Sequence, residues 1–219
     1  MRAADRPRAA DLFSGAGGAA MGMHRAGFEV EGWDNRPQKN YPFKFNLGDA
    51  LEADLSGFDF VWASPPCQAY SKASRARRNL GHSYPDLMAA TRSKLEAFGG
   101  PYIIENVPGA PMRCDIMLCG SMFGLKLVRH RIFETNIGRL IMTHPCQHPE
   151  LAVCVVGNGT PTWVRDKNGG KGFLIEDCRR AMGIDWMNRN ELSQAIPPAY
   201  SEFLCRQILK AITQSACLS

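Results

Sequence analysis

Strand-like and helix-like segments alternate along this chain, and the first strand-like segment runs directly into a glycine-rich turn. Apolar strand candidates at 9–13, 28–33, 43–47, 58–63 and 102–104 alternate with helix candidates at 19–26, 84–98, 174–182 and 198–212. Alternation of this kind is typical of a mostly parallel sheet that is covered by helices on both faces. We therefore predict an α/β fold with such a sheet.

The composition is that of a compact globular domain. Of the 219 residues, 45% are hydrophobic and 21% are charged, so the chain can bury a core and is not disordered. No apolar run of about 18 residues predicts a membrane span, and Met1–Arg8 has no apolar segment behind it that would indicate secretion. We therefore expect the eight cysteines to be reduced thiols in a cytosol-like compartment. The net charge of +5 (26 basic less 21 acidic residues) permits a nucleic-acid partner without requiring one.

The glycine-rich segment Asp11–Gly18 lies where a strand is expected to turn into a helix. Glycines let the backbone approach a ligand closely, and the start of the helix offers free N–H groups. Asp34 follows Asp11 by 23 residues, at the end of the next strand candidate, where a carboxylate can bind ribose hydroxyls. Asp49 follows the third strand candidate and could meet the adenine edge of the same ligand. The pattern predicts a nucleoside-type cofactor, and its glycine spacing is not the G-x-G-x-x-G of dinucleotide-binding proteins.

Cys67 comes just past a buried strand candidate, after the two prolines Pro65 and Pro66. The prolines stiffen the turn, and ligands of open α/β sheets bind outside the carboxyl ends of the strands. A thiolate at this place is a strong nucleophile. The segment 68–83 that follows is polar and basic, and we predict that it is a mobile loop that contacts a phosphate backbone through Lys72, Arg75, Arg77 and Arg78.

Two further charged elements accompany the cysteine. Glu105 ends an apolar strand candidate, where burial would raise its pKa and allow it to carry a proton at neutral pH. The segment Leu127–Phe133 predicts a strand with Arg129 and Arg131 on one side. Such a pair could hold a carboxylate, a base carbonyl or a phosphate.

In this order, these segments resemble the motifs of the DNA (cytosine-5)-methyltransferase family. Asp11–Gly18 resembles its S-adenosylmethionine loop, Pro65–Gln68 its nucleophile motif, Glu105–Val107 its base-pocket motif, and Arg129-x-Arg131 its arginine motif. The resemblance covers about residues 9–135, and Gln194–Tyr200 resembles a degenerate form of the last motif. It implies a Rossmann-like S-adenosylmethionine-dependent methyltransferase fold. It also implies an enzyme that transfers a methyl group to C5 of cytosine in DNA.

The resemblance implies a role for each of these side chains. Cys67 would add to C6 of a flipped cytosine, Glu105 would hydrogen-bond N3 and the exocyclic amine, and Arg131 would hold O2. Arg129 would support the Cys67 loop, and we expect bound water to take the C5 proton. The expected cofactor-binding residues are Phe13, Ser14, Gly15, Ala16, Gly17, Gly18, Asp34, Asn35, Asp49, Ala50 and Pro65. The expected nucleic-acid contacts are Gln68, Ser71, Lys72, Arg75, Arg77 and Arg78.

The region after the arginine motif is shorter than in the family, whose members usually carry a target recognition domain there. We expect a catalytic core at 1–135, a short insertion at 136–172 and C-terminal helices at 173–219 that complete the core. The insertion contains His144-Pro-Cys146-Gln-His148, whose spacing is not a recognised zinc pattern, so we expect a polar loop and no metal site. A short or relaxed target sequence, or a separate partner protein that supplies recognition, would then replace the missing domain.

The sequence leaves several alternatives open. The substrate could be single-stranded DNA, RNA such as tRNA, or a free nucleotide, and the chain could instead be a non-catalytic nucleic-acid-binding relic. The leading interpretation is a monomeric modification enzyme of restriction-modification type, which acts on DNA in the cytoplasm of a bacterium or a phage-infected cell and does not bind membranes.

Overall fold

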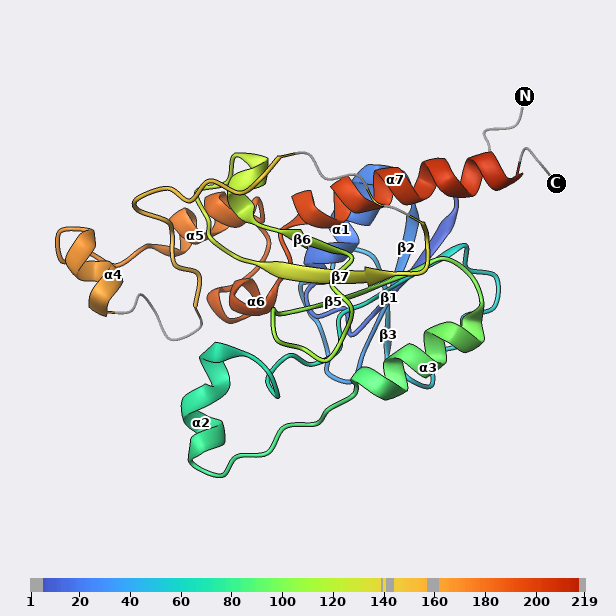
Figure 1. Ribbon diagram of the computed structural model, residues 1–219, viewed down its shortest axis with the longest axis horizontal. Helices are drawn as coiled ribbons and strands as arrows, with labels where there is room; N and C mark the ends of the chain where they lie inside the picture. Colours follow the sequence, from blue (N-terminus) through green and yellow to red (C-terminus); the bar gives the residue numbers. More distant parts are fainter. Residues whose placement is uncertain (1–5, 139, 141–143, 157–161, 217–219) are drawn as a thin grey trace.

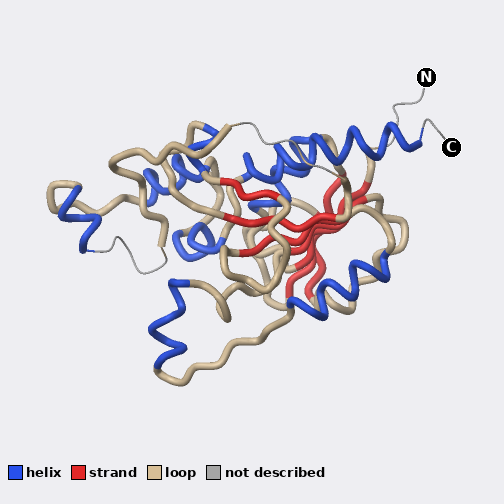
Figure 2. The backbone as a smooth tube through the Cα atoms, viewed as in Figure 1, coloured by secondary structure: helices blue, strands red, loops and turns tan. Residues whose placement is uncertain are grey.

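A computed structural model describes residues 6–138, 140, 144–156 and 162–216 of the chain. The described residues form one mixed sheet with the strand order β3-β2-β1-β4-β5-β7-β6 (Figures 1 and 2). Its strands are β1 (Arg8–Leu12), β2 (Glu29–Asp34), β3 (Lys44–Leu47), β4 (Phe60–Ala63), β5 (Tyr102–Asn106), β6 (Ile116–Leu118) and β7 (Arg131–Thr135). The first five strands are parallel, whereas β7 is antiparallel to both β5 and β6.

Seven α-helices and two short 3-10 helices are found in the described part of the chain. The α-helices are α1 (Gly18–Ala26), α2 (Arg75–Asn79), α3 (Met88–Phe98), α4 (Thr162–Lys167), α5 (Ile175–Met182), α6 (Arg189–Gln194) and α7 (Pro198–Ala216). The 3-10 helices are η1 (Lys72–Ser74) and η2 (Gly120–Phe123). Figure 1 shows α1 and α7 together on one side of the sheet and α3 on the other. None of the described helices combines the length and the apolar character needed to cross a bilayer.

Alternate residues of the central strands face two separate cores. In β4, Phe60 and Trp62 pack with side chains of α1 and α7, whereas Val61 and Ala63 pack on the opposite face with α3. Successive strand side chains point to opposite faces, so a strand buried on both sides reads as a continuous apolar run. All four residues of β4 are buried. This explains why these strands are recognisable in the sequence without any polar alternation.

The predicted α/β fold and its main elements are confirmed, with differences at particular points. The strand predicted at 9–13 is β1, which ends at Leu12. The helix predicted at 19–26 is α1, which ends at Ala26 as predicted, and Gly27, with a φ of 117°, closes it in the left-handed region. The three-residue strand β6 was not predicted, because its short sequence, Ile-Met-Leu, carries no alternation. The segment 68–83, predicted as a loop, contains η1 and α2.

The pairing of α1 with α7 depends on a glycine inside α1. A Cβ added at Gly22 would overlap with Ser201 Oγ and Pro198 O and would lie 2.6 Å from Glu202 N. The two helix backbones therefore approach more closely than any side chain would allow. Glycine in a helix interior costs about 0.5–1 kcal/mol relative to alanine, and here that cost is offset by close packing.

We expect Gly22→Ala to destabilise the protein by about 1–3 kcal/mol, because the extra methyl group must push α7 away from α1. Unfolding in denaturant, followed by far-UV circular dichroism, measures the change. The control is Arg25→Ala on the same helix, where Arg25 is exposed, and it should change the unfolding free energy by less than about 0.5 kcal/mol. Equal stability of Gly22→Ala and wild type would contradict the packing argument.

Candidate active site

The turn after β1 has an unusual backbone. Phe13 has a φ of 58°, a left-handed conformation that costs a bulky residue about 1–3 kcal/mol, and Gly15 and Gly17 follow with φ values of 49° and 82°. The turn is held by a hydrogen bond of 3.0 Å from Ser14 N to Trp33 O. The chain can thus leave β1, turn sharply and start α1 with its free N–H groups at the carboxyl edge of the sheet.

Asp34 connects this turn to the end of β2. Its Oδ2 accepts a hydrogen bond of 3.0 Å from Gly15 N, and its Oδ1 accepts one of 3.0 Å from Arg36 N. A further bond of 3.0 Å from Gly48 N to Asp34 O ties the end of β3 to the same point. The predicted neighbourhood of Asp34 and the glycine turn is therefore present, and Asp49 follows directly on the exposed surface.

The three glycines of the turn differ in their surroundings. A Cβ at Gly15 would meet nothing within 4 Å, so this glycine borders open space. A Cβ at Gly17 would lie 2.8 Å from Pro42 Cδ, and one at Gly18 would overlap with Ile196 O. Packing of the protein against itself is enough to require glycine at the last two positions. Phe13, Gly15 and the Asp34 carboxylate are the parts of the turn that a ligand can reach.

The remaining cofactor candidates lie around the same edge with unequal exposure. Asn35 and Asp49 are exposed, whereas Ala50 and Pro65 are buried. Ala16 is buried as well, and its carbonyl accepts a hydrogen bond of 2.9 Å from Trp186 Nε1. The segment between α5 and α6, which contains Trp186, thus holds the glycine turn in place through this hydrogen bond.

Cys67 is positioned by two hydrogen bonds that hold the turn before it. Ser64 N donates to Leu12 O at 3.1 Å, and the side chain of Asn106 donates to Pro65 O at 3.0 Å. Asn106 is itself buried at the end of β5. The nucleophile candidate is therefore fixed to the ends of both β1 and β5, and its side chain is half-buried.

Glu105 and Arg131 form an ion pair beside this turn. Arg131 Nε lies 3.0 Å from Glu105 Oε1, and only 6% of the Glu105 side chain and 13% of the Arg131 side chain are exposed. The pair forms because β7 runs antiparallel to β5, which brings the start of β7 next to the end of β5. Burial raises the pKa of Glu105, although the positive charge of Arg131 opposes this effect.

Arg129 and Arg131 were predicted to lie on one side of a single strand, and this prediction is wrong. Arg129 precedes β7, which begins at Arg131, and its Nη2 donates a hydrogen bond of 2.6 Å to Ser193 O. Its backbone carbonyl accepts a bond of 2.7 Å from the hydroxyl of Tyr200. Burial and the charge of Arg131 lower the pKa of Arg129 to about 9, so the guanidinium keeps its charge at neutral pH. Arg129 therefore joins the C-terminal helices to the site.

The charges around Cys67 act on its thiol in opposite directions. Burial raises the pKa of Cys67, and the negative charge of Glu105 raises it further, whereas Arg131 and Arg129 lower it. In the free protein the first two effects prevail, so the thiol is mostly protonated at neutral pH. A group that neutralises Glu105 would make the thiolate easier to form.

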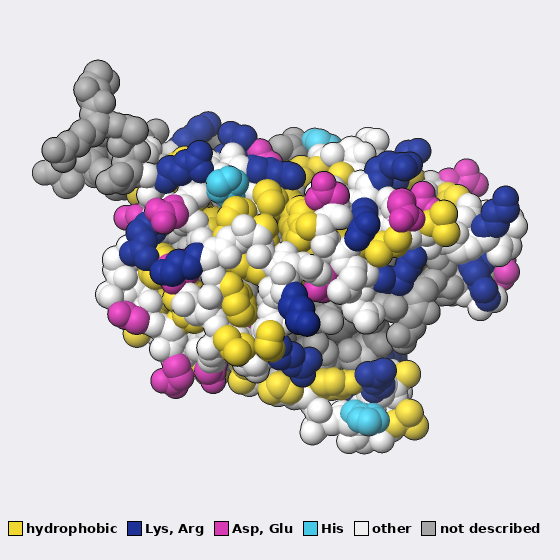
Figure 3. All heavy atoms as spheres, turned by 180° about the vertical axis from the view of Figure 1, so that it is seen from behind, with side chains coloured by type: hydrophobic (Ala, Val, Ile, Leu, Met, Phe, Trp, Pro, Cys, Tyr) yellow, Lys and Arg dark blue, Asp and Glu magenta, His cyan; other side chains and the backbone are white. Residues whose placement is uncertain are grey.

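The basic segment after Cys67 projects from the body of the molecule, where Figure 1 shows α2 apart from the sheet. The side chains of Lys72, Arg75 and Arg77 are exposed. Arg78 instead donates hydrogen bonds of 2.6 Å to Gln68 O and 2.8 Å to Ser71 O, and so holds the start of the segment together. On the face seen in Figure 3, by contrast, basic side chains are interspersed with acidic and apolar ones.

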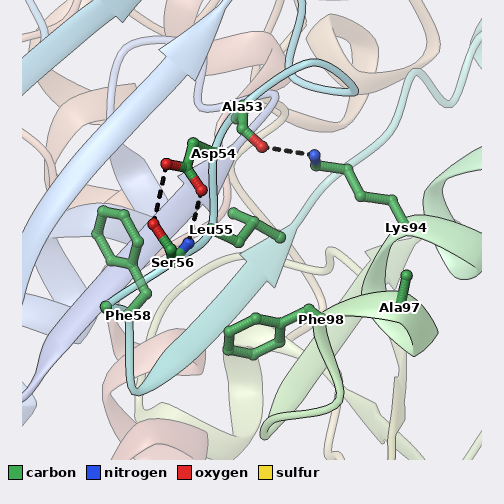
Figure 4. A pocket seen from close by; sticks show the side chains of 9 residues that line it. Ala53, Asp54, Leu55, Ser56, Phe58, Lys94, Ala97 and Phe98 are labelled. Carbon is green, nitrogen blue, oxygen red and sulfur yellow. Dashed lines mark hydrogen bonds between the residues drawn. The ribbon is translucent and has the colours of Figure 1, made fainter.

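An open hollow of about 500 Å³ lies elsewhere, between the segment before β4 and the end of α3 (Figure 4). It is lined by Leu55, Phe58, Lys94 and Phe98 among others, and the Lys94 ammonium is bound to Ala53 O. Residues 53–58 precede β4 and residues 94–98 precede β5, whereas Cys67 follows β4. The hollow is therefore at the amino ends of these strands, opposite the site. It takes no part in the site described above.

Three residues of the site were given no role of their own in the sequence, although each lies within or beside a predicted motif. Asn106 and Ser64 flank predicted site residues, and their positions at the ends of β5 and β4 were the available signal. Asp11 is the buried next-to-last residue of β1. Its Oδ2 accepts a hydrogen bond of 3.3 Å from the Tyr41 hydroxyl, and its Oδ1 has no partner in the described part of the chain. Burial raises the pKa of Asp11 well above its ordinary value.

We expect Glu105→Gln to make Cys67 more reactive toward iodoacetamide. Removing the negative charge that raises the pKa of Cys67 should move its alkylation profile to lower pH, and each unit of decrease raises the thiolate fraction about tenfold at a fixed pH below the pKa. Peptide mass spectrometry follows each thiol separately. Cys114, which is exposed and has Asp115 as its charged neighbour, is the internal reference and should not change. An unchanged or upward-shifted Cys67 profile would show that Glu105 does not act on the thiol.

Comparison with known proteins bears directly on this arrangement. The family model of the C-5 cytosine-specific DNA methylases matches residues 8–111, which include Cys67 and Glu105. The type II methyltransferase M.FnuDI of Fusobacterium nucleatum is 35% identical over 236 aligned positions, which cover 87% of this chain and 68% of that protein. M.HindV of Haemophilus influenzae is 30% identical over 116 positions, and the match spans only 36% of its length.

Structural similarity extends over more of the chain. A prophage-encoded protein of E. coli, assigned as a DNA modification methyltransferase, superimposes with a TM-score of 0.66 over 94% of this chain and 99% of its own. At 13% sequence identity this likeness concerns the fold, and it confirms the predicted Rossmann-like methyltransferase architecture. The match to M.FnuDI, over two thirds of that protein, concerns the family: this chain belongs to the C-5 cytosine-specific DNA methylases.

Proposed function

We propose that this protein is an S-adenosylmethionine-dependent methyltransferase that forms a covalent bond between Cys67 and C6 of a cytosine in DNA. The observation that carries the proposal is the meeting of three side chains at one sheet edge. Cys67 follows β4, and Glu105 lies near the end of the adjacent strand β5. Arg131 is the first residue of β7, and its Nε lies 3.0 Å from Glu105 Oε1. A nucleophile, a buried acid and a cation are what addition to a pyrimidine ring requires.

Each of the three groups has a defined task toward the base. The Cys67 thiolate forms a bond to C6, and the electron pair of the C5–C6 double bond moves to C5, which becomes nucleophilic. Glu105, whose pKa is raised by burial, can donate a proton to N3 and accept a hydrogen bond from the exocyclic amine. Arg131 stabilises the charge that develops on O2. Once C5 carries the methyl group, its proton passes to bound water, and the Cys67–C6 bond breaks to restore the ring.

The residues around the glycine turn fit the proposed cofactor. Gly15 borders open space, the Asp34 carboxylate is held at the end of β2, and Phe13 is a half-buried ring beside them. When bound, S-adenosylmethionine supplies an electrophilic methyl group. We assign ribose binding to Asp34, adenine contacts to Phe13 and Asp49, and the positions beside and below the adenine ring to Asn35 and Pro65. Ser14, Ala16, Gly17, Gly18 and Ala50 complete the proposed site as the buried residues that hold the shape of the turn and its surroundings.

The half-buried position of Cys67 supports base flipping. A half-buried thiol at the carboxyl ends of the strands cannot reach C6 of a cytosine that is stacked and paired, so the base must leave the duplex. The exposed Lys72, Arg75 and Arg77 stand on the segment that directly follows Cys67, where they can contact phosphates next to the flipped base. Arg78 keeps the segment folded and contributes to DNA binding indirectly, while Gln68 and Ser71 lie nearest to the nucleophile.

The division into a core at 1–135, an insertion at 136–172 and completing helices at 173–219 remains part of the proposal. The contact of Arg129 with Ser193 and that of Trp186 with Ala16 support a role of the last part in completing the core. A region as short as the insertion can read few base pairs by direct contact. We therefore propose that the protein acts as a monomer on a short or relaxed target sequence, or with a partner that supplies recognition.

We expect Cys67→Ala to abolish methyl transfer and to leave S-adenosylmethionine affinity within about twofold of wild type, because the thiol belongs to the base-binding half of the site. Labelled cofactor is offered with duplex DNA, single-stranded DNA, tRNA and dCTP, and the products are identified by nucleoside mass spectrometry. Calorimetry measures cofactor binding.

The control for that assay is Cys114→Ala, since Cys114 is an exposed thiol far along the chain from the β4 turn. It should methylate duplex DNA at the wild-type rate. Turnover by Cys67→Ala would refute the covalent mechanism, and 5-methylcytosine formed only in tRNA or dCTP would refute DNA as the substrate. Normal cofactor binding without product from any substrate would instead favour a binding protein.

We also expect the double change Arg75→Ala and Arg77→Ala to weaken DNA binding and to lower its salt dependence. Each lost phosphate contact should reduce the slope of log K against log salt by about 0.9. Fluorescence anisotropy with duplex DNA at several salt concentrations measures both quantities. Arg25→Ala removes an exposed charge from α1 and should leave the slope unchanged. Identical slopes for all three proteins would exclude α2 from the DNA interface.

A further inference from the structure

Four side chains with metal-binding chemistry meet at the edge of the sheet next to the proposed active site. Cys119 directly follows β6, and His130 directly precedes β7. The two strands pair in the register Leu118 with Arg131, so Cys119 and His130 are placed as the next pair along the ladder. Both residues are therefore fixed by the strand pairing, independently of any ligand.

The other two members come from the segment 144–148, which follows β7 along the chain. Cys146 Sγ lies 3.6 Å from His130 Nε2, and His148 Nε2 lies 3.3 Å from the same nitrogen. The ligand atoms of Cys119, His130, Cys146 and His148 all lie within 4.8 Å of one another. Cys119 is fully buried, His130 and Cys146 are half-buried, and His148 is exposed.

Two of these separations equal the edges of a tetrahedron around one zinc ion, and the others are at most 4.8 Å. With Zn–S bonds of about 2.3 Å and Zn–N bonds of about 2.05 Å, tetrahedral angles put two nitrogens about 3.3 Å apart and a nitrogen and a sulfur about 3.6 Å apart. The two recorded distances have these values. Hydrogen bonding between single pairs would not by itself bring four ligand atoms within 4.8 Å of one another.

We propose that Cys119, His130, Cys146 and His148 bind one Zn²⁺ in a closed, structural Cys₂His₂ site. Binding releases the two thiol protons to water, and the two thiolates then balance the double positive charge of the ion. The neutral complex can be half-buried without a large desolvation cost. Two soft sulfurs and two imidazoles in a tetrahedron favour zinc over the oxygen-preferring Mg²⁺ and Ca²⁺. With four protein ligands, no position is left open for a substrate.

One contact outside the four ligands supports the site. Ser121 Oγ lies 3.5 Å from Cys119 Sγ, where its hydroxyl can donate to the thiolate. Hydrogen bonds from such neighbours orient metal ligands and stabilise their charged form. Cys146 also packs against the core that contains Cys119, so the segment 144–148 is already held near the sheet.

The proposed site has a consequence for the rest of the molecule. His130 lies between Arg129 and Arg131 in the chain. An ion bound to His130 would therefore restrain the backbone of both arginines. The ion would also tie the segment after β7 to the β6–β7 pair. This inference concerns the architecture of the chain and holds whether or not the protein methylates DNA.

The first experiment measures zinc in the full-length chain, purified without chelators, by inductively coupled plasma mass spectrometry. We expect about one zinc per chain in wild type. Cys146→Ser and His148→Ala should each lower the bound zinc at least about tenfold after dialysis, because even changes to neighbours of metal ligands weaken affinity about 10–100-fold. Matched controls are His144→Ala in the same segment and Cys154→Ser, whose half-buried thiol is not in the cluster; both should keep the zinc.

The second experiment uses only the wild-type chain and so does not depend on the folding of a variant. Zinc is removed with a chelator, and Co²⁺ is added to the protein in reducing buffer. One equivalent should produce the visible bands of tetrahedral cobalt and the near-ultraviolet charge-transfer band of cobalt–thiolate bonds, and Zn²⁺ should displace both. A zinc-free wild-type chain with no cobalt–thiolate band would overturn the proposal. So would zinc retained by Cys146→Ser, or a Cys119–Cys146 disulfide in the freshly purified protein.

Discussion

The site depends on the reversal of one strand. Because β7 is antiparallel to β5, its first residue, Arg131, lies beside the carboxyl end of β5, where Glu105 is buried. Removing one member of such a pair leaves an uncompensated buried charge and costs about 3–5 kcal/mol, so the two side chains hold each other in place. The next residue of β5, Asn106, fixes Pro65 and with it the turn that carries Cys67. A single strand end thus positions the acid, the cation and the nucleophile.

The two halves of the proposed site meet where the order of the strands reverses. β2 and β3 lie on one side of β1, and β4 and β5 on the other, and the crevice between β1 and β4 is the place where open α/β sheets bind their ligands. The cofactor half uses the ends of β1, β2 and β3, and the base half uses those of β4 and β5 and the start of β7. The backbone bond from Ser64 to Leu12 joins the halves, and the C-terminal region supports both through Trp186 and Arg129.

Local sequence patterns predicted much of this arrangement. The glycine turn, Asp34, the proline turn before Cys67 and Glu105 could be found because each lies at or just after the end of an apolar strand, and parallel strands end at the same edge. Arg129 was misplaced, because a run of alternating residues at 127–133 looks like one strand, whereas the strand starts only at Arg131. The turn of helix in the basic segment was missed, since its side chains pack on no core and leave no apolar pattern.

The sequence by itself determined the family, the α/β architecture and the order of the motifs, because these rest on short segments whose chemistry and spacing are local. The tertiary structure decided which distant side chains share a site. Cys119, His130, Cys146 and His148 are separated by intervals that match no zinc pattern, and the antiparallel pairing of β6 and β7 with the return of the chain at 144–148 brings them together. It likewise made Arg131 the partner of Glu105, because the direction of a strand is set by the whole sheet and not by its own residues.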